Sequence, residues 1–185
     1  MSQHLSQKSN KICLVGDFCL SGETTNSELL STRIDPWASL RSTFGDDAVI
    51  IANIECPFTD EPHGLPFKWA NLKTSPELHW LLDGLSVAVL GNNHFADFGA
   101  QGVRDTQALL TSKGILSVGY GESITDALKP AFLDVGGHRL GMLSLCCPTT
   151  NSENLATHRT PGVAPLGMQT LKQAIENTKT ICDAL

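Results

Sequence analysis

The stretch that decides the fold is VAVLGNNHFADFG, residues 87–99. It begins with a short apolar run and then turns abruptly polar. Such a run, closed by a glycine, is typical of a buried parallel strand. The polar residues that follow it are Asn92, Asn93, His94 and Asp97. Ligands of open α/β sheets bind beyond the carboxyl ends of the strands, so this pattern predicts a functional site at the end of a strand.

Two earlier apolar runs end in the same way. KICLVG, residues 11–16, is followed by Asp17, and AVIIAN, residues 48–53, brings Asn53 and then Glu55. Parallel strands place their carboxyl ends at one edge, so we expect these side chains to meet. Carboxylate, amide and imidazole groups suit a divalent metal such as Mn²⁺, Fe²⁺, Zn²⁺ or Mg²⁺.

Each of these residues also has a purely local interpretation. Asp17 could cap a turn, the two asparagines could shape one, and His94 could be a buried, hydrogen-bonded side chain. Three successive strand ends that all carry such residues favour a shared site over three separate coincidences. A nearby thiol, Cys19, could approach this site, but a packed free cysteine is the simpler interpretation.

The remaining pattern predicts an α/β fold, a mostly parallel sheet flanked by helices, in one domain. Asp35 and Ser75 are expected N-caps of two helices, and Gly136-Gly137 suits a two-residue hairpin loop. The expected helices are 36–44, a segment after Ser75, 99–113 and one from about 166; further strands are expected at 115–119, 131–135 and 138–146, with a short one at 66–70 in the loop 56–74.

Composition excludes several classes of function. The 185 residues are 41% hydrophobic with a formal net charge of −6, so no basic field attracts nucleic acid. The apolar runs are far shorter than the ~20 residues of a membrane span. Residues 1–10 are polar, lack the core of a signal peptide, and are expected to be a disordered lead-in. Six cysteines without a C-x-x-C pair favour free thiols and a reducing, cytoplasmic location.

Several motifs together resemble the bacterial capsule-synthesis CapA family, also called the poly-γ-glutamate biosynthesis family. That family is similar in fold and site layout to the calcineurin-like metallophosphoesterases. The matching segments run in unbroken order from residue 11 to about 180. They are VGDFCLSG (15–22), DPWASLRSTF (35–44), ANIECPFTD (52–60), GNNHFADFGAQGVRDTQALLTSKGILSVGYG (91–121) and PGVAPLGMQTLKQAI (161–175).

The resemblance implies a partial calcineurin-like metallophosphoesterase sandwich over residues 11–185, with roles for individual residues. The implied metal ligands, for two divalent ions, are Asp17, Asn53, Glu55 and Asn93. His94 matches the histidine of the phosphoesterase G-N-H motif and is the implied proton donor. Asp97 would orient or polarise that imidazole. Asn92 is expected only to shape the turn.

Two departures from the pattern qualify what the resemblance implies. Cys19 stands where phosphoesterases usually place a histidine, and the family's later motifs, H-W-G-x-E and G-H-x-P-H, do not occur before the chain closes with TKTICDAL. We therefore expect the N-terminal portion of a domain, inactive by itself, that self-associates or needs a complementary C-terminal segment.

Two functions follow as alternatives. One is a metal-dependent phosphoesterase-type hydrolase acting on a small phosphoester or a polymer precursor. The other is a non-catalytic accessory role in making an extracellular polymer such as capsule or poly-γ-glutamate. Neither involves nucleic acid or a membrane segment.

Overall fold

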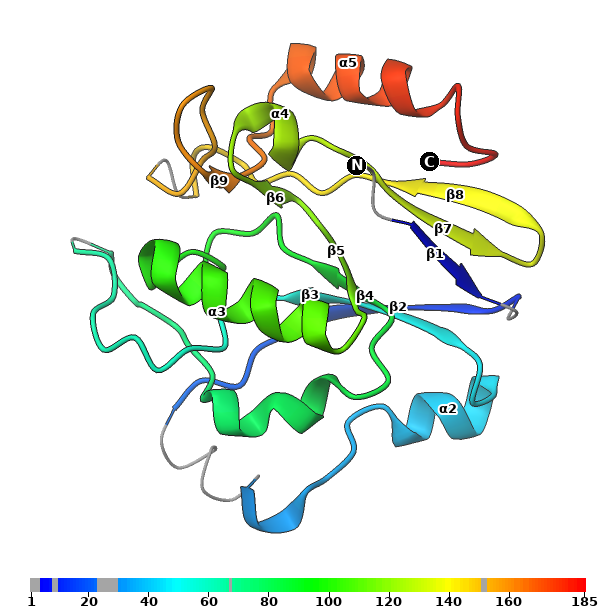
Figure 1. Ribbon diagram of the computed structural model, residues 1–185, viewed down its shortest axis with the longest axis horizontal. Helices are drawn as coiled ribbons and strands as arrows, with labels where there is room; N and C mark the ends of the chain where they lie inside the picture. Colours follow the sequence, from blue (N-terminus) through cyan, green and yellow to red (C-terminus); the bar gives the residue numbers. More distant parts are fainter. Residues whose placement is uncertain (1–3, 8–9, 23–29, 67, 151–152) are drawn as a thin grey trace.

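A parallel sheet of four strands holds the middle of the molecule (Figure 1). The computed structural model describes residues 4–7, 10–22, 30–66, 68–150 and 153–185. The strands lie in the order β2-β3-β4-β5 and all neighbouring pairs are parallel. They are β2 (Ile12–Phe18), β3 (Val49–Ile54), β4 (Val87–Val89) and β5 (Leu116–Val118). These are the four apolar runs that predicted a parallel sheet.

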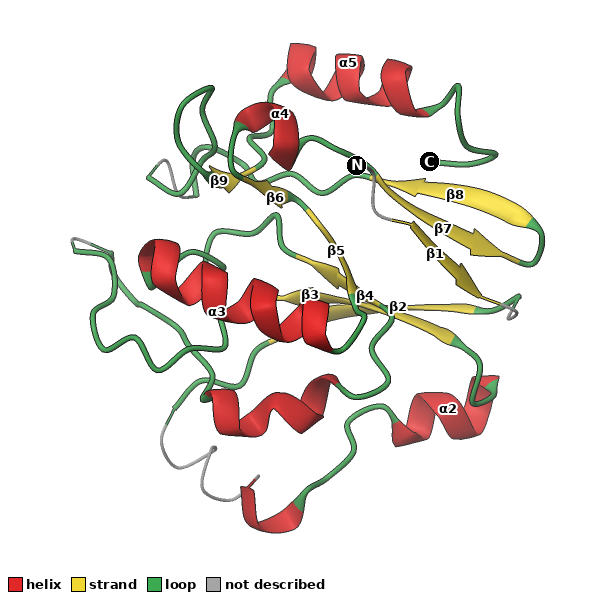
Figure 2. Ribbon diagram, viewed as in Figure 1, coloured by secondary structure: helices red, strands yellow, loops and turns green. Residues whose placement is uncertain are grey.

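A second sheet lies over the first, so the two sheets form a sandwich (Figure 2). Its strand order is β1-β7-β8, formed by β1 (His4–Gln7), β7 (Ala131–Val135) and β8 (His138–Met142). Helix α5 (Met168–Thr178) covers its outer face, while α2 (Ala38–Phe44) and α3 (Gly99–Ser112) lie beyond the four-stranded sheet. Two sheets between two helical layers give the α/β sandwich of calcineurin-like type that the resemblance implied.

Strand β1 corrects the expectation of a disordered lead-in. His4–Gln7 pairs in parallel with β7, with Leu5 opposite Leu133. Leu5 also packs against the apolar layer between the sheets. The segment HLSQ has one apolar side chain, too few for periodicity to reveal a strand, and its backbone is held by the free edge of β7. Residues 1–3 and 8–9 lie outside the described part of the chain.

The two faces of β3 explain why its sequence is almost continuously apolar. Val49 and Ile51 face the second sheet, in the cluster that includes Val87, Leu116 and Leu133. The alternate residues Ile50, Ala52 and Ile54 face the helices instead. A strand covered on both faces needs apolar side chains on both, and only Asn53, at its end, departs from the pattern.

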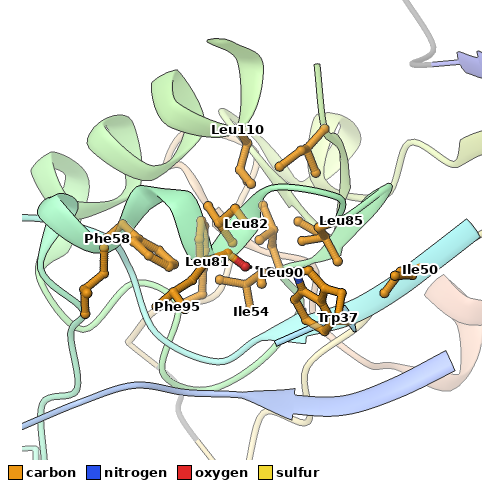
Figure 3. Packing of buried hydrophobic residues seen from close by; sticks show 14 of the residues in the cluster. Trp37, Ile50, Ile54, Phe58, Leu81, Leu82, Leu85, Leu90, Phe95 and Leu110 are labelled. Atoms are coloured by element: carbon orange, nitrogen blue, oxygen red, sulfur yellow. Dashed lines mark hydrogen bonds between the residues drawn. The ribbon is translucent and has the colours of Figure 1, made fainter. Parts of the chain in front are cut away.

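The core on the helical side is built around large buried side chains (Figure 3). Trp37 is 2% exposed, and its indole Nε1 donates a hydrogen bond of 2.9 Å to the carbonyl of Leu81. Phe95, just after the polar stretch of the opening motif, is fully buried in the same cluster. The turn that carries His94 is therefore anchored to the main core by its neighbour.

The helices begin and end close to their predicted positions. Helix α2 begins two residues late, with Trp37 as N-cap; Asp35 accepts from the Trp37 amide without capping the helix. Ser75 does cap the next helix, Pro76–Leu82, but this is a 3₁₀ helix. Gly114 follows α3 at φ +68°, a conformation that favours glycine at a helix end. None of the helices in the described ranges is long and apolar enough to cross a lipid bilayer.

The later part of the chain contains the predicted hairpin and several short elements that were not predicted. Gly136 and Gly137 have φ values of +59° and +84°, as a tight loop between β7 and β8 requires. Strand β8 ends at Met142, four residues before the predicted end. The unpredicted elements are the antiparallel strands β6 (Tyr120–Gly121) and β9 (Gly162–Val163), which pair with each other, and the short helix α4 (Ile124–Ala127) next to them.

One short strand was predicted wrongly. Residues 66 and 68–70 lie in turn, bend and irregular conformations, and residue 67 lies outside the described part. The loop is instead fixed by side chains, among them Lys68, whose contacts belong to the candidate site.

The sandwich is open along one side, between the edge strands β2 and β8. A cleft of about 830 Å³ lies there, lined mainly by aliphatic side chains. Leu14, in the middle of β2, is 80% exposed, which is unusual for a leucine within a sheet. Its neighbours in the strand, Cys13 and Val15, face the helical side. The face of β2 toward the second sheet is thus apolar and uncovered.

Candidate functional site

The carboxyl ends of β2, β3 and β4 bring the predicted polar residues to one edge of the sheet. Asp17 lies opposite Asn53, and Asn53 lies opposite Val89, two residues before Gly91. The register of β2 shifts between Val15 and Asp17, and this shift sets Asp17 in line with Asn53. The first half of the site therefore depends on an irregularity at Gly16, where the parallel pairing is interrupted.

Asp17 and Glu55 converge on a single atom. The amide nitrogen of Asn53 donates a hydrogen bond of 2.7 Å to Asp17 Oδ1 and one of 2.6 Å to Glu55 Oε2. Two carboxylates that share one donor lie close enough to share a cation in its place. The hydrogen bonds that Asn53 donates thus offset part of the repulsion between the Asp17 and Glu55 carboxylates.

Asn92 fixes the orientation of Asn53. Its Nδ2 donates to Asn53 Oδ1 at 3.0 Å and to the carbonyl of Ile54 at 2.9 Å. Its Oδ1 accepts from the backbone amides of His94, at 2.9 Å, and Phe95, at 2.7 Å. Backbone groups on both sides determine which end of the Asn92 amide is the donor. Asn53 must in consequence present its oxygen to Asn92 and its nitrogen to the carboxylates.

His94 and Asp97 form the second half of the site. His94 Nδ1 lies 2.7 Å from Asp97 Oδ2, and the Asp97 carboxylate is fully buried. The backbone amide of Leu72 donates to the same oxygen at 2.8 Å. A carboxylate only accepts hydrogen bonds, so Nδ1 carries the proton and Nε2 is the nitrogen available for proton exchange.

Lys68 completes this half of the site, although the sequence pattern did not indicate it. Its ammonium pairs with Asp97 Oδ1 and donates to the carbonyl of Asn93 at 2.6 Å. It also lies 3.2 Å from His94 Nδ1, a longer contact than the 2.7 Å from that nitrogen to Asp97, to which Nδ1 donates. The Lys68 side chain is only 15% exposed. It supplies the positive charge that a buried carboxylate requires.

The two halves are joined through Asn92, which contacts Asn53 on one side and the amide of His94 on the other. The structure therefore brings together Asp17, Asn53 and Glu55, and separately His94 and Asp97, within one hydrogen-bonded network. Asn93 lies in the turn between them, with its carbonyl held by Lys68. Asn92, which was expected only to shape the turn, also positions a side chain of the neighbouring strand.

Ionisation in the site is shifted by burial and by neighbouring groups. Burial raises the pKa of Glu55, the Asn53 hydrogen bond opposes that rise, and the charge of Asp17 adds to it. Contact with Cys56 lowers the pKa of the Cys19 thiol, while contact with Cys19 and burial raise the pKa of Cys56. A cation bound beside Glu55 would favour its ionised form, because the positive charge would offset both burial and the charge of Asp17.

The donor set fits a divalent cation in part. Asp17 and Glu55 provide two hard oxygen ligands at a shared point. Asn53 fits less well, because its oxygen is committed to Asn92 and its nitrogen would have to leave the shared point. Among the residues that the structure describes, no group of three or more His, Cys, Asp or Glu side chains could hold a metal ion by itself. To bind a metal ion, the carboxylate pair would therefore need further ligands from amide groups, from water or from another polypeptide segment.

Comparison with known proteins gives one family. Residues 11–185 match the family model described as bacterial capsule synthesis protein PGA_cap. The chain is 33% identical, over 108 residues, to a probable polyglutamine synthesis accessory protein of Mycobacterium tuberculosis, strain CDC 1551 / Oshkosh. It is 28% identical, over 138 residues, to the PGA biosynthesis protein CapA of Bacillus subtilis, strain 168.

These relatives are much longer than this chain. The alignments cover 56% and 72% of this chain, but only 28% of the Mycobacterium protein and 36% of the Bacillus subtilis protein. A capsule biosynthesis protein CapA of Bacillus anthracis is 29% identical over 96 residues, which is 52% of this chain and 23% of that protein. The chain thus spans about a third or less of the relatives it matches.

Proposed function

The chain belongs to the bacterial capsule synthesis protein family, and from this premise we propose that its site serves metal-dependent hydrolysis of a phosphoester. The observation that carries the proposal is the convergence of Asp17 and Glu55 on one atom, beside a histidine that is oriented by a buried carboxylate. Carboxylates for a cation and an oriented imidazole are the two requirements of such chemistry.

Asp17 and Glu55 would hold the cation. A divalent ion bound there supplies positive charge for the developing negative charge of a phosphoryl group. The charge of the ion would displace the Asn53 amide nitrogen, which now occupies the point between the carboxylates. Asn93, at the same turn, is proposed as a further ligand through its side-chain oxygen, and a second ion would need ligands beyond the carboxylate pair. Mn²⁺, Fe²⁺, Zn²⁺ and Mg²⁺ all accept such oxygen donors, and Mn²⁺ is the practical probe.

His94 would transfer a proton at Nε2. With Nδ1 donating to Asp97, the ring is fixed in one orientation, and a protonated ring can give the Nε2 proton to a leaving oxygen. Lys68 keeps the Asp97 carboxylate paired throughout, so the aspartate has no need to take the proton itself. In this proposal His94 transfers the proton, Asp97 holds the imidazole in its orientation, and Lys68 balances the charge of the Asp97 carboxylate.

A non-catalytic accessory role is the second candidate, and one observation favours it. The Mycobacterium relative is named a probable accessory protein of polyglutamine synthesis. In that role the site would bind metal for structure or for contact with a partner in capsule or poly-γ-glutamate synthesis. All six cysteines are free thiols, which supports a reducing compartment, the cytoplasm, for either role.

Turnover of a generic phosphodiester separates the two candidates. The assay uses bis(p-nitrophenyl) phosphate with Mn²⁺ on this chain and on the longer Bacillus subtilis relative. Hydrolysis by the relative that is lost when its residue at the position aligned with His94 is changed to alanine supports the hydrolase. Metal binding by both proteins without turnover by either overturns it in favour of the accessory role. We expect this chain alone to show no measurable turnover, because its described residues offer the cation only the carboxylate pair and the proposed ligand Asn93.

A further inference from the structure

Two thiols face each other beside the carboxylate pair. Cys19 Sγ and Cys56 Sγ are 3.6 Å apart, although 37 positions separate the residues in the chain. Cys19 directly follows β2, and Cys56 lies two residues beyond β3. The two sulfurs are thus presented by the ends of neighbouring strands.

The backbone holds this proximity in place. Phe18 is in register with Ile54, and the amide of Glu55 donates to the carbonyl of Phe18 at 3.2 Å. Cys19 and Cys56 follow these paired residues closely, so the two chain segments that carry them lie side by side where the strands end. The distance between the sulfurs is therefore set by the pairing of β2 with β3 as well as by side-chain rotamers.

The two thiols differ in their access to solvent. Cys56 is 1% exposed, and its sulfur contacts Thr74 Oγ1 at 3.2 Å. Thr74 in turn donates to the carbonyl of Leu20, so the loop at Thr74 closes one side of the pair. Cys19 is only partly buried. In such an arrangement the accessible thiol reacts with an oxidant, and the buried thiol then attacks the oxidised sulfur to form a disulfide.

The sulfur contacts of three other cysteines are to oxygen atoms. Cys146 and Cys147 contact the hydroxyls of Thr150 and Thr149, and Cys182 donates to the carbonyl of Thr178. Cys13 is buried in the core on the helical side. Cys19 and Cys56 are consequently the two cysteines that the fold places in position to form a disulfide.

We propose that Cys19 and Cys56 are a modification site, a dithiol pair that a peroxide converts to a disulfide. The Cys19 sulfur attacks one peroxide oxygen; the S–O bond forms, the O–O bond breaks and one water leaves after protonation. The Cys56 sulfur then attacks the Cys19 sulfur; the S–S bond forms, the S–O bond breaks and a second water leaves. Two electrons pass from the thiols to the peroxide, and a dithiol reductant reverses the step by exchange.

The disulfide would tie together the two strand ends that carry the carboxylates. Asp17 lies two residues before Cys19, and Glu55 lies directly before Cys56. Bond formation must bring the sulfurs from 3.6 Å to about 2.05 Å, which fixes the spacing of these two strand ends. In a reducing compartment such a bond is transient and serves redox sensing, not permanent stabilisation. The proposal does not depend on the hydrolase, since it needs only the thiols.

Peptide mapping tests it on the intact chain. The reduced protein is treated with one equivalent of hydrogen peroxide, its remaining thiols are blocked with N-ethylmaleimide, and its mass and non-reduced tryptic peptides are measured. We expect four blocked thiols, six minus two, and a link between peptides 12–33 and 42–68 that dithiothreitol removes.

Variants and an unfolded control decide the assignment. Peptide 12–33 also contains Cys13, so Cys13→Ser should keep the link, whereas Cys19→Ser and Cys56→Ser should each lose it. The same oxidation in guanidinium chloride should give mixed pairings. A link that survives in Cys19→Ser, or folded wild-type protein that keeps six blockable thiols, overturns the proposal. Circular dichroism of each variant shows that it is folded.

Discussion

The imidazole Nδ1 of His94 lies 2.7 Å from the fully buried carboxylate of Asp97. The two residues are three positions apart in one turn, and the turn is anchored by Phe95 in the main core. Lys68, from a distant loop, neutralises the same carboxylate. A buried carboxylate is retained only when it is paired, so this contact should matter for stability as well as for function.

Asp97→Asn should destabilise the protein by about 2 to 4 kcal/mol, because it leaves the Lys68 ammonium without its partner in a nearly buried place. Urea unfolding followed by circular dichroism measures the change. Asp83→Asn is the matched control, since Asp83 pairs with Lys113 at the surface and should cost less than about 1 kcal/mol. Equal costs for the two variants would show that the Lys68–Asp97 pair contributes no more than a surface ion pair.

Asn92→Ala should lower the free energy of unfolding by about 2 to 3 kcal/mol. The change removes the hydrogen bonds from the Asn92 side chain to Asn53, to the carbonyl of Ile54 and to the amide of His94. Asn92→Asp keeps the acceptor for His94 and Phe95 but loses both donor contacts, so it should also weaken the fold. The exposed amide of Gln101, which bonds Asp105 within α3, offers the control Gln101→Ala, expected to change stability by less than about 0.5 kcal/mol. If Asn92→Ala is as mild as this control, the amide does not lock Asn53.

Glu55→Gln should stabilise the metal-free protein at neutral pH. Burial raises the pKa of Glu55 in the folded state, so the folded protein binds this proton more tightly than the unfolded chain does. Stability must then fall as pH rises through the raised pKa, and the neutral amide avoids that loss. The gain should vanish as pH falls toward the ordinary carboxyl range. Thermal unfolding from pH 4 to 8 measures it, with exposed Glu77→Gln as the control. A gain that persists at the lowest pH would contradict this cause.

The open edge at β2 should lead to self-association. Leu14 is 80% exposed on a strand that pairs on one side only, and a second copy presents the same edge. Sedimentation velocity should show a concentration-dependent dimer that Leu14→Lys abolishes. Trp69→Lys is matched to it, because Trp69 is equally apolar and fully exposed but lies in a loop. Dimers that survive Leu14→Lys, or that Trp69→Lys removes, would exclude the β2 edge as the interface.

Much of the fold could be predicted from local patterns. Short apolar runs that end in glycine or asparagine predicted β2, β3 and β4, and Gly136-Gly137 predicted the β7–β8 hairpin. Periodicity does not say which sheet a strand joins, so the sandwich came from the family resemblance. Strand β1 was missed because its place is set by the free edge of β7 and not by its own side chains.

The candidate site was predictable where it follows strands and unpredictable where it depends on a loop. Asp17, Asn53 and Glu55 come to one edge because parallel strands end together, a rule that needs only the order of elements, whereas the register shift that sets Asp17 opposite Asn53 was not predicted. Lys68 reaches Asp97 across 29 positions from a segment with no regular structure. No periodicity marks such a residue. The one indication of such a residue was indirect: a buried Asp97 carboxylate needs a cationic side chain as its partner.

Calorimetric titration of this chain with Mn²⁺ tests the central claim most directly. The account predicts weak binding that Asp17→Asn and Glu55→Gln each reduce by about tenfold or more, because either change removes one of two shared ligands. His94→Ala should leave the affinity within about twofold, since His94 is assigned to proton transfer. Unchanged Mn²⁺ affinity in Asp17→Asn, or loss of binding in His94→Ala alone, would contradict the assignment of the metal to the carboxylate pair.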